Sequence, residues 1–293
     1  MRGVHPAIVT HFDGELNVDH DAVAAEVQRL IAGGVDGIVA CGTMGEANSL
    51  SRSERSEVVR TAVAAVDGRV PVCVGVSAPS AEHAAGYARD AAAAGADGLM
   101  SLPPLLYRAD RHELREYLAA VCAATDLPLM LYNNPEASGV DLEPELLADL
   151  TRELPAITSI KDSSGDARRI AELLGRCDGV DVLVGGDDWA LEGACMGAAG
   201  WVAGVAVVLP ERCVELWRLG VAGELDQARP LYAELLPLAR YDMTAKLVQY
   251  FKAALDEIGI GGGPCRPPRL ALTESELRSL REATALARRV AQR

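Results

Sequence analysis

Short runs of apolar and β-branched residues recur along the chain, and each is followed by a longer segment with the spacing of an amphipathic helix. Alternating strands and helices form a parallel sheet, and eight such units can close into a barrel. We therefore expect an α/β fold, a (β/α)₈ TIM barrel. The eight predicted strands are residues 7–10, 37–41, 70–76, 98–102, 127–132, 156–161, 180–184 and 200–206.

The segments between the strands carry helix signals at their ends. The helix predicted for residues 52–66 follows Ser51, and Glu54 stands three residues after that serine, which is typical of a capping box. The helix predicted for residues 81–94 is expected to stop at Gly95. The alternative is a doubly wound open sheet, but its G-x-G-x-x-G turn after the first strand is missing.

After residue 223 the pattern predicts helices only, separated by a loop at residues 261–268 that holds three glycines and three prolines and cannot be helical. We therefore predict a catalytic barrel in residues 1–223 and a small C-terminal helical appendage in residues 224–293. The helices predicted for the appendage are residues 225–239, 244–258 and 275–291.

Composition excludes several classes of partner. A net charge of −14 and a pI near 4.8 argue against nucleic acid and against an anionic membrane surface. The acidic N-terminal residues do not resemble a signal peptide, and the uncharged residues 193–210 are too short and glycine-rich for a membrane span. The seven cysteines contain no C-x-x-C pair, which is typical of reduced thiols. We expect a cytoplasmic protein with a small-molecule substrate.

Lysine is rare in this chain. Of 28 basic residues only Lys161, Lys246 and Lys252 are lysines, and the others are arginines. Lys246 and Lys252 lie in a predicted helix, with Asp242 and Asp256 four residues away as expected ion-pair partners. Lys161 instead ends a predicted strand, where barrel enzymes place their chemistry.

A lysine amine can attack a carbonyl or imine carbon and form a Schiff base, which a guanidinium cannot do. Desolvation in an apolar pocket favours the neutral, nucleophilic amine. Lys161 is therefore the first candidate for a covalent catalytic residue. The alternative is a structural ion pair between Lys161 and Asp162 or Asp187.

Two further strand ends carry candidate groups. Tyr132 closes an apolar strand beside the lysine strand and could relay protons, although a buried structural tyrosine is the alternative. At the end of the second strand, glycines on both sides of Thr43 could let backbone N–H groups approach a carboxylate. Thr43 and Glu46 also have capping-box spacing, so a purely structural turn remains open.

The seventh strand is followed by Asp187 and Asp188. Two adjacent carboxylates would repel a phosphate, so we expect them to cap a loop and a helix. The five histidines do not cluster with acids at strand ends, and we predict no metal site.

Taken together, five motifs resemble the dihydrodipicolinate synthase/N-acetylneuraminate lyase family. The resemblance implies that Lys161 forms the Schiff base and that Tyr132 is the proton donor and acceptor. It also implies that Thr43 and the Met44 backbone bind the substrate carboxylate, that the Val202 carbonyl lines the site near the lysine, and that the enzyme is a homotetramer without metal or organic cofactor. The motifs are residues 42–46 (GTMGE), 132–135 (YNNP), 160–166 (IKDSSGD), 186–188 (GDD) and 200–204 (GWVAG).

The sequence departs from dihydrodipicolinate synthases at three positions. Met44 replaces a second threonine, and Ala137 replaces the arginine that holds the carboxylate of aspartate semialdehyde. Leu106 stands where the family lends a tyrosine to the neighbouring subunit, with Tyr107 shifted by one position. These changes would remove the second-substrate contact and the proton relay, so a role in lysine biosynthesis is not expected.

The remaining details resemble a different branch, the 1-pyrroline-4-hydroxy-2-carboxylate deaminases of hydroxyproline catabolism. We expect this reaction, which gives 2,5-dioxopentanoate and ammonia from a cyclic imine. The alternatives are a pyruvate-dependent aldolase or dehydratase of a sugar acid, a 4-hydroxy-tetrahydrodipicolinate synthase, and a catalytically silent barrel. The segments that carry this resemblance are residues 41–50, 132–142, 200–204, 242–248 and 266–270.

Overall fold

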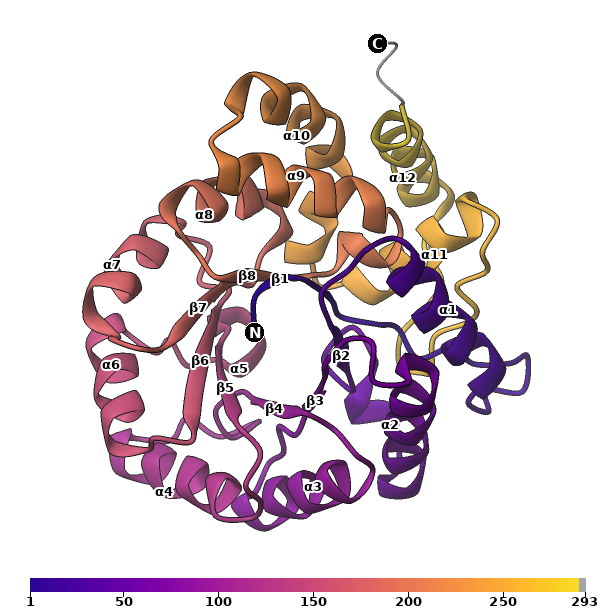
Figure 1. Cartoon of the computed structure of the whole chain (residues 1–293). Helices are drawn as coiled ribbons and strands as arrows, with labels where there is room; N and C mark the ends of the chain where they lie inside the picture. The colour runs from indigo at the N-terminus through magenta and orange to yellow at the C-terminus, as the bar shows by residue number, and fades with distance from the viewer. Residues whose placement is uncertain (290–293) are drawn as a thin grey trace.

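In the computed structural model, which describes residues 1–289, eight parallel strands form one sheet in the order β1-β8-β7-β6-β5-β4-β3-β2. A bridge between Ala7 and Val39 joins the two end strands and closes the barrel (Figure 1). The predicted (β/α)₈ fold is confirmed. The strands are β1 (Gly3–Pro6), β2 (Ile38–Ala40), β3 (Val72–Gly75), β4 (Gly98–Ser101), β5 (Leu129–Asn133), β6 (Ile157–Asp162), β7 (Asp181–Val184) and β8 (Gly200–Ala203).

Helices surround this sheet, as Figure 1 shows. The predicted capping box at the start of α2 is present, because the Ser51 backbone N–H donates to the Glu54 carboxylate at 2.7 Å and the Glu54 N–H donates to the serine hydroxyl. The helices that follow the strands are α1 (His20–Ala32), α2 (Arg52–Val66), α3 (Ala81–Ala93), α4 (Arg111–Cys122), α5 (Pro135–Ser138), α6 (Pro144–Glu153), α7 (Arg168–Arg176), α8 (Ala190–Met196) and α9 (Pro210–Ala222).

The first strand differs from the prediction. It covers Gly3–Pro6 rather than residues 7–10, whereas the other seven strands overlap their predicted runs. His5 hid the strand from a search for apolar runs, yet its imidazole is fully buried and burial lowers its pKa to about 4. Ile8 and Val9 are buried in the loop that follows the strand, and the Ile8 backbone N–H donates to the Val39 carbonyl of β2 at 2.9 Å, next to the bridge that closes the barrel.

Three further helices follow the barrel, on the side where Figure 1 runs from orange to yellow: α10 (Leu225–Ala239), α11 (Leu247–Glu257) and α12 (Glu274–Ala287). The first matches its prediction, and the second begins at Leu247 rather than at residue 244, because residues 244–246 form a turn between the 3₁₀ helix η4 (Arg240–Met243) and α11. The third was predicted to reach residue 291 but ends at Ala287, and residues 290–291 lie outside the described part of the chain. We propose that residues 224–289 form the predicted helical appendage, and we call them the C-terminal helices.

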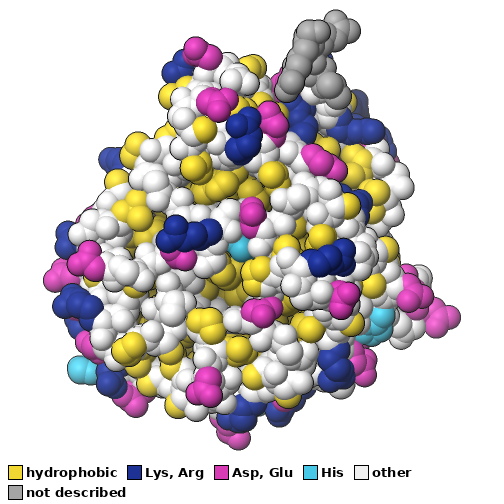
Figure 2. Space-filling model, in the orientation of Figure 1, with side chains coloured by type: hydrophobic (Ala, Val, Ile, Leu, Met, Phe, Trp, Pro, Cys, Tyr) yellow, Lys and Arg dark blue, Asp and Glu magenta, His cyan; other side chains and the backbone are white. Residues whose placement is uncertain are grey.

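The core has two layers. The larger layer lies between the strands and the surrounding helices, and a smaller cluster of eight buried residues fills the inside of the barrel. Tyr132 and Val202 belong to the inner cluster, which places both beside the barrel axis. Charged side chains lie mainly toward the outline of the molecule in Figure 2, with apolar side chains nearer its centre. No helix within residues 1–289 is long and apolar enough to cross a membrane.

Candidate active site

Lys161 and Tyr132 lie side by side at the carboxyl ends of β6 and β5. They are direct partners in the parallel register, and the lysine Nζ lies 4.0 Å from the centre of the tyrosine ring. Both side chains are buried, with only 6% and 5% of their surface exposed. The amine is therefore held against the face of the ring inside the barrel.

The ion pairs considered for Lys161 do not form. Both carboxylate oxygens of Asp162 are taken by other groups, since one accepts from Asn133 Nδ2 at 2.8 Å and the other from the Ser164 hydroxyl at 2.6 Å. Asp187 accepts from an indole N–H and from two backbone N–H groups of the segment around β8. Within residues 1–289, Lys161 makes no salt bridge that would prevent its amine from acting as a nucleophile.

Gly185, at the end of β7, provides the space that Lys161 occupies. A Cβ atom at this position would lie 2.8 Å from the Lys161 Cε and 2.1 Å from the hydroxyl of Ser163. Such contacts are too short for any side chain, so the path of the lysine requires glycine here.

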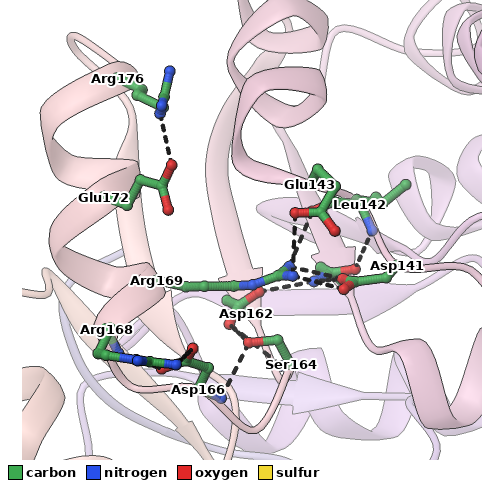
Figure 3. Close-up of polar contacts among 11 residues, drawn as sticks. Asp141, Leu142, Glu143, Asp162, Ser164, Asp166, Arg168, Arg169, Glu172 and Arg176 are labelled. Carbon is green, nitrogen blue, oxygen red and sulfur yellow. Dashed lines mark hydrogen bonds and ion pairs between the residues drawn. The ribbon is translucent and has the colours of Figure 1, made fainter.

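Polar residues form a network around Asp162, at the end of β6, that includes Asp141 and Arg169 (Figure 3). Asn133 Nδ2 donates both to Asp162 at 2.8 Å and to Asp141 at 3.1 Å, and its oxygen accepts from the Leu142 backbone N–H at 2.9 Å. Arg169 then holds both oxygens of Asp141, at 2.7 and 2.6 Å. Asn133 and Asp162 directly follow the candidate tyrosine and lysine, so this network fixes the two strand ends relative to each other.

The Tyr132 hydroxyl has one hydrogen-bond donor beside it. Asn134 Nδ2 donates to the phenol oxygen at 2.8 Å, and the other end of the same amide accepts from the Ala137 backbone N–H and caps α5. Because the asparagine donates, the phenol proton remains free to be given to another acceptor.

A cavity of about 230 Å³ opens at this end of the barrel. The structure brings Thr43 and Tyr132 together on its wall. Lys161, Met44 and Val202 do not line the cavity but are buried next to it. The lining residues are Cys41, Gly42, Thr43, Ala47, Asn48, Gly75, Ser77, Met100, Leu102, Leu105, Tyr132, Ala137 and Arg269.

The turn that carries Thr43 has an unusual backbone. Cys41 and Glu46, on either side of it, both have left-handed conformations, with φ of 54° and 51°. Non-glycine residues adopt this region at a cost, which is often found at functional sites. Gly75 is needed beneath the turn, because a Cβ there would lie 2.3 Å from the Cys41 carbonyl oxygen. The exposed Thr43 is thereby presented to the cavity.

The other two lysines have partners that differ from the predicted ones. Lys246 lies 2.6 Å from Glu276, not beside Asp242. Lys252 is not paired with Asp256, whose carboxylate accepts from the Gly262 N–H instead. The Lys246 prediction was wrong because Asp242 lies in the 3₁₀ turn η4 and not in the same helix as the lysine. The Lys252 prediction was wrong although Lys252 and Asp256 both lie in α11, because the lysine side chain is buried against Glu46 and the Pro264 carbonyl.

Lys252 instead forms a buried ion pair with Glu46, with 2.8 Å between Nζ and the carboxylate, and donates to the Pro264 carbonyl at 2.7 Å. Glu46 is therefore not the capping residue that its spacing after Thr43 suggested. It ties the cavity turn to the C-terminal helices.

Two further carboxyl groups, those of Asp187 and Asp242, have raised pKa values. Burial and the neighbouring charge of Asp242 raise the pKa of Asp187, although the N–H groups of Gly204 and Val205 donate to it, as expected of a loop cap. Burial also raises the pKa of Asp242, to about 6, against the opposing effect of the Lys161 charge. Within residues 1–289, no three His, Cys, Asp or Glu side chains are grouped so that they could hold a metal ion.

Two arginines of the site were not found from the sequence. Arg55, in α2, donates to the Ala47 carbonyl at 3.1 Å and to the Gly75 carbonyl at 2.5 Å, and so holds two backbone segments of the cavity wall. Arg269 lines the cavity itself, from the loop between α11 and α12. Nothing in the local pattern predicts a role for either residue, although Arg269 lies in residues 266–270, one of the segments that carry the resemblance to the deaminases.

The position at which the family lends a tyrosine carries Leu106. This side chain is 97% exposed and has φ of 66°. Tyr107 is half exposed, and its hydroxyl donates to Glu113 at 2.5 Å. Neither side chain lines the cavity of its own chain.

Comparison with known proteins gives a consistent result. Residues 1–286 match the model of the family described as the Dihydrodipicolinate synthetase family. A 4-hydroxy-tetrahydrodipicolinate synthase from Methanoculleus marisnigri is 35% identical, over 96% of this chain and 98% of its own. A solved putative dihydrodipicolinate synthetase from Pseudomonas aeruginosa is 32% identical, with a TM-score of 0.93 over 98% of this chain and all of that one. The Escherichia coli prophage protein YagE, solved with pyruvate, is 27% identical, with a TM-score of 0.92 and 98% of both chains covered.

Proposed function

The chain belongs to the dihydrodipicolinate synthetase family of class I Schiff-base lyases, and we propose that it deaminates 1-pyrroline-4-hydroxy-2-carboxylate to 2,5-dioxopentanoate and ammonia. The observation that carries this proposal is the unpaired Lys161 amine against the Tyr132 ring, beside a cavity whose wall has alanine at position 137. A cyclic imine with a single carboxylate needs no second carboxylate contact there. The Thr43 turn would bind its one carboxylate.

In the first step the neutral Lys161 amine attacks C2 of the ring. The bond between C2 and the ring nitrogen breaks, and this nitrogen takes a proton and remains attached to C5 as an amine. The product is an open chain held to the enzyme as a protonated Schiff base, which draws electrons from the neighbouring carbons.

In the second step a proton leaves C3 and the hydroxyl leaves C4 as water. Tyr132 is the proposed base and acid, because its phenol is oriented by Asn134 and retains a proton to give. The resulting double bond between C3 and C4 moves to C4–C5, and the product then tautomerises to an imine between C5 and the nitrogen. One water hydrolyses that imine and releases ammonia, and a second water releases 2,5-dioxopentanoate from Lys161. One water is lost and two are consumed, so the overall reaction takes up one water.

A second candidate function is 4-hydroxy-tetrahydrodipicolinate synthase. The name of the relative from Methanoculleus marisnigri supports it. Ala137 and the exposed Leu106 count against it, because they replace the groups that would bind the second substrate and complete the proton relay in such an enzyme.

The two functions are separated by one pair of assays. The purified protein is given the hydroxy-pyrroline, and ammonia and 2,5-dioxopentanoate are measured. It is given pyruvate and aspartate semialdehyde in parallel, and condensation is measured. Ammonia release at the higher kcat/KM supports the deaminase, whereas condensation without deamination overturns it.

Borohydride trapping tests the covalent step directly. Reduction in the presence of substrate should add one ligand mass at Lys161, as located by mass spectrometry. Lys161→Ala should abolish turnover and trapping while leaving the circular dichroism spectrum unchanged. Tyr132→Phe should still be trapped but lose about 10²-fold or more of its rate, because only the proton transfers are impaired. A Tyr132→Phe enzyme with near-normal turnover would refute the proton role.

A further inference from the structure

Arg269 brings a guanidinium to the cavity from outside the barrel. It belongs to the loop between α11 and α12, and it lines the cavity together with Thr43, Tyr132 and Ala137. On its other side it borders a second cavity of about 290 Å³ among the C-terminal helices. The side chain therefore forms part of the wall between the two spaces, and it is partly buried.

Within residues 1–289, only the Nη1 group of this guanidinium contacts other polar groups of the protein. Nη1 of Arg269 donates to the Ser49 hydroxyl at 3.1 Å and lies 3.4 Å from a Glu46 oxygen. The Nε and Nη2 groups have no hydrogen-bond partner within residues 1–289. Since a guanidinium has five N–H donors in a fixed plane, the side chain is held in place and keeps donors for a ligand.

The charge of Arg269 is also not balanced by Glu46. That carboxylate is fully buried and is already paired with Lys252 at 2.8 Å, which is closer than its contact with the arginine. One carboxylate thus faces two cations, and the cluster carries one excess positive charge beside the cavity. Such a charge favours an electron-rich oxygen at this wall.

We propose that Arg269 binds an oxygen substituent at the far end of the substrate, away from the carbon that Lys161 attacks. Which oxygen this is rests on the proposed function: for the deaminase it is the 4-hydroxyl of the hydroxy-pyrroline. The guanidinium donates to this oxygen and stabilises the negative charge that grows on it as the C4–O bond breaks. The proton that completes the departing water comes from Tyr132. The arginine missing at position 137 is in this way replaced by one from the C-terminal helices.

The test compares two ligands that differ only in this oxygen. Lys161 is trapped with borohydride at increasing concentrations of 1-pyrroline-4-hydroxy-2-carboxylate or of 1-pyrroline-2-carboxylate, which has no 4-hydroxyl. Arg269→Met should raise the half-saturating concentration of the hydroxylated ligand about 10-fold or more, the range for one charged hydrogen bond. It should leave the concentration for the other ligand unchanged. Arg168→Met is the matched control, because among residues 1–289 that exposed arginine pairs with Asp166 alone.

The outcomes separate this proposal from the proposed function. Equal weakening of both ligands by Arg269→Met, or no weakening of either, overturns the role of Arg269. Selective weakening in an enzyme that releases no ammonia supports the role but refutes the deaminase. If neither imine is trapped, the deaminase fails, and the variant is assayed with pyruvate and aspartate semialdehyde. If Arg269→Met then raises the KM for the semialdehyde alone, Arg269 binds an oxygen of the semialdehyde carboxylate. An unchanged KM for the semialdehyde overturns the proposal.

Discussion

Asn133 is the residue on which the alignment of Lys161 with Tyr132 should depend most strongly. It is fully buried, and it makes three hydrogen bonds, to Asp162, Asp141 and the Leu142 backbone. Asn133→Ala leaves a buried carboxylate with one donor fewer and a buried N–H group without its acceptor. Each such loss costs about 1–3 kcal/mol, so the variant should be less stable by about 3–4 kcal/mol.

The control is Arg169→Met. Arg169 holds the same network from its outer side, through an ion pair with the partly exposed Asp141. Removing a partly exposed pair of this kind costs about 1 kcal/mol. The two variants therefore disturb one network from its buried and its exposed end.

Thermal unfolding followed by circular dichroism measures the difference. At about 2 °C for each kcal/mol in a chain of this size, Asn133→Ala should lower Tm by about 6–8 °C and Arg169→Met by about 2 °C. Borohydride trapping of Lys161 in the folded Asn133→Ala protein should also be slower, because the end of β5 is no longer held to the end of β6. Equal Tm values for the two variants, or normal trapping in Asn133→Ala, would show that the network does not align the pair.

Two other perturbations test the links between the C-terminal helices and the barrel. The Arg266 guanidinium, 2.5 Å away, lowers the pKa of Glu54 from 4.5 to about 2, so this carboxylate stabilises the fold above pH 4.5 and loses the effect as the pH falls toward 2. Glu54→Gln should cost about 1–2 kcal/mol at pH 7, allowing for partial exposure, and clearly less at pH 3; a Tm deficit independent of pH would contradict this. Lys252→Met leaves Glu46 buried beside a single, more distant cation, Arg269. The free energy of unfolding measured in urea should therefore fall by about 3–5 kcal/mol, and a fall below about 1 kcal/mol would show that the pair does not stabilise the fold.

The barrel and the adjacency of Lys161 and Tyr132 could be predicted because their signals are local. In the sequence, Lys161 and Tyr132 each follow a short run of mostly apolar residues, which predicts that each ends a strand. The parallel register of β5 and β6 then places the two residues side by side. The capping box of α2 is likewise contained within four residues. The strand β1 was predicted at the wrong residues because it contains the buried His5, which interrupts the run of apolar residues that would predict a strand.

The part of the site that could not be predicted is formed by contacts between distant segments. Glu46 and Lys252 are separated by 206 positions, and Arg269 reaches the cavity from a loop whose glycines and prolines predict only that it is not helical. A pattern of apolar and polar residues records which face of an element is buried, but not which distant charge meets it there. Burying Glu46 without a cation would be costly, so the turn that presents Thr43 requires the C-terminal helices as well as the barrel. The specificity of the cavity should therefore vary with residues 224–289, whereas the proposed covalent chemistry should depend on residues of the barrel strands.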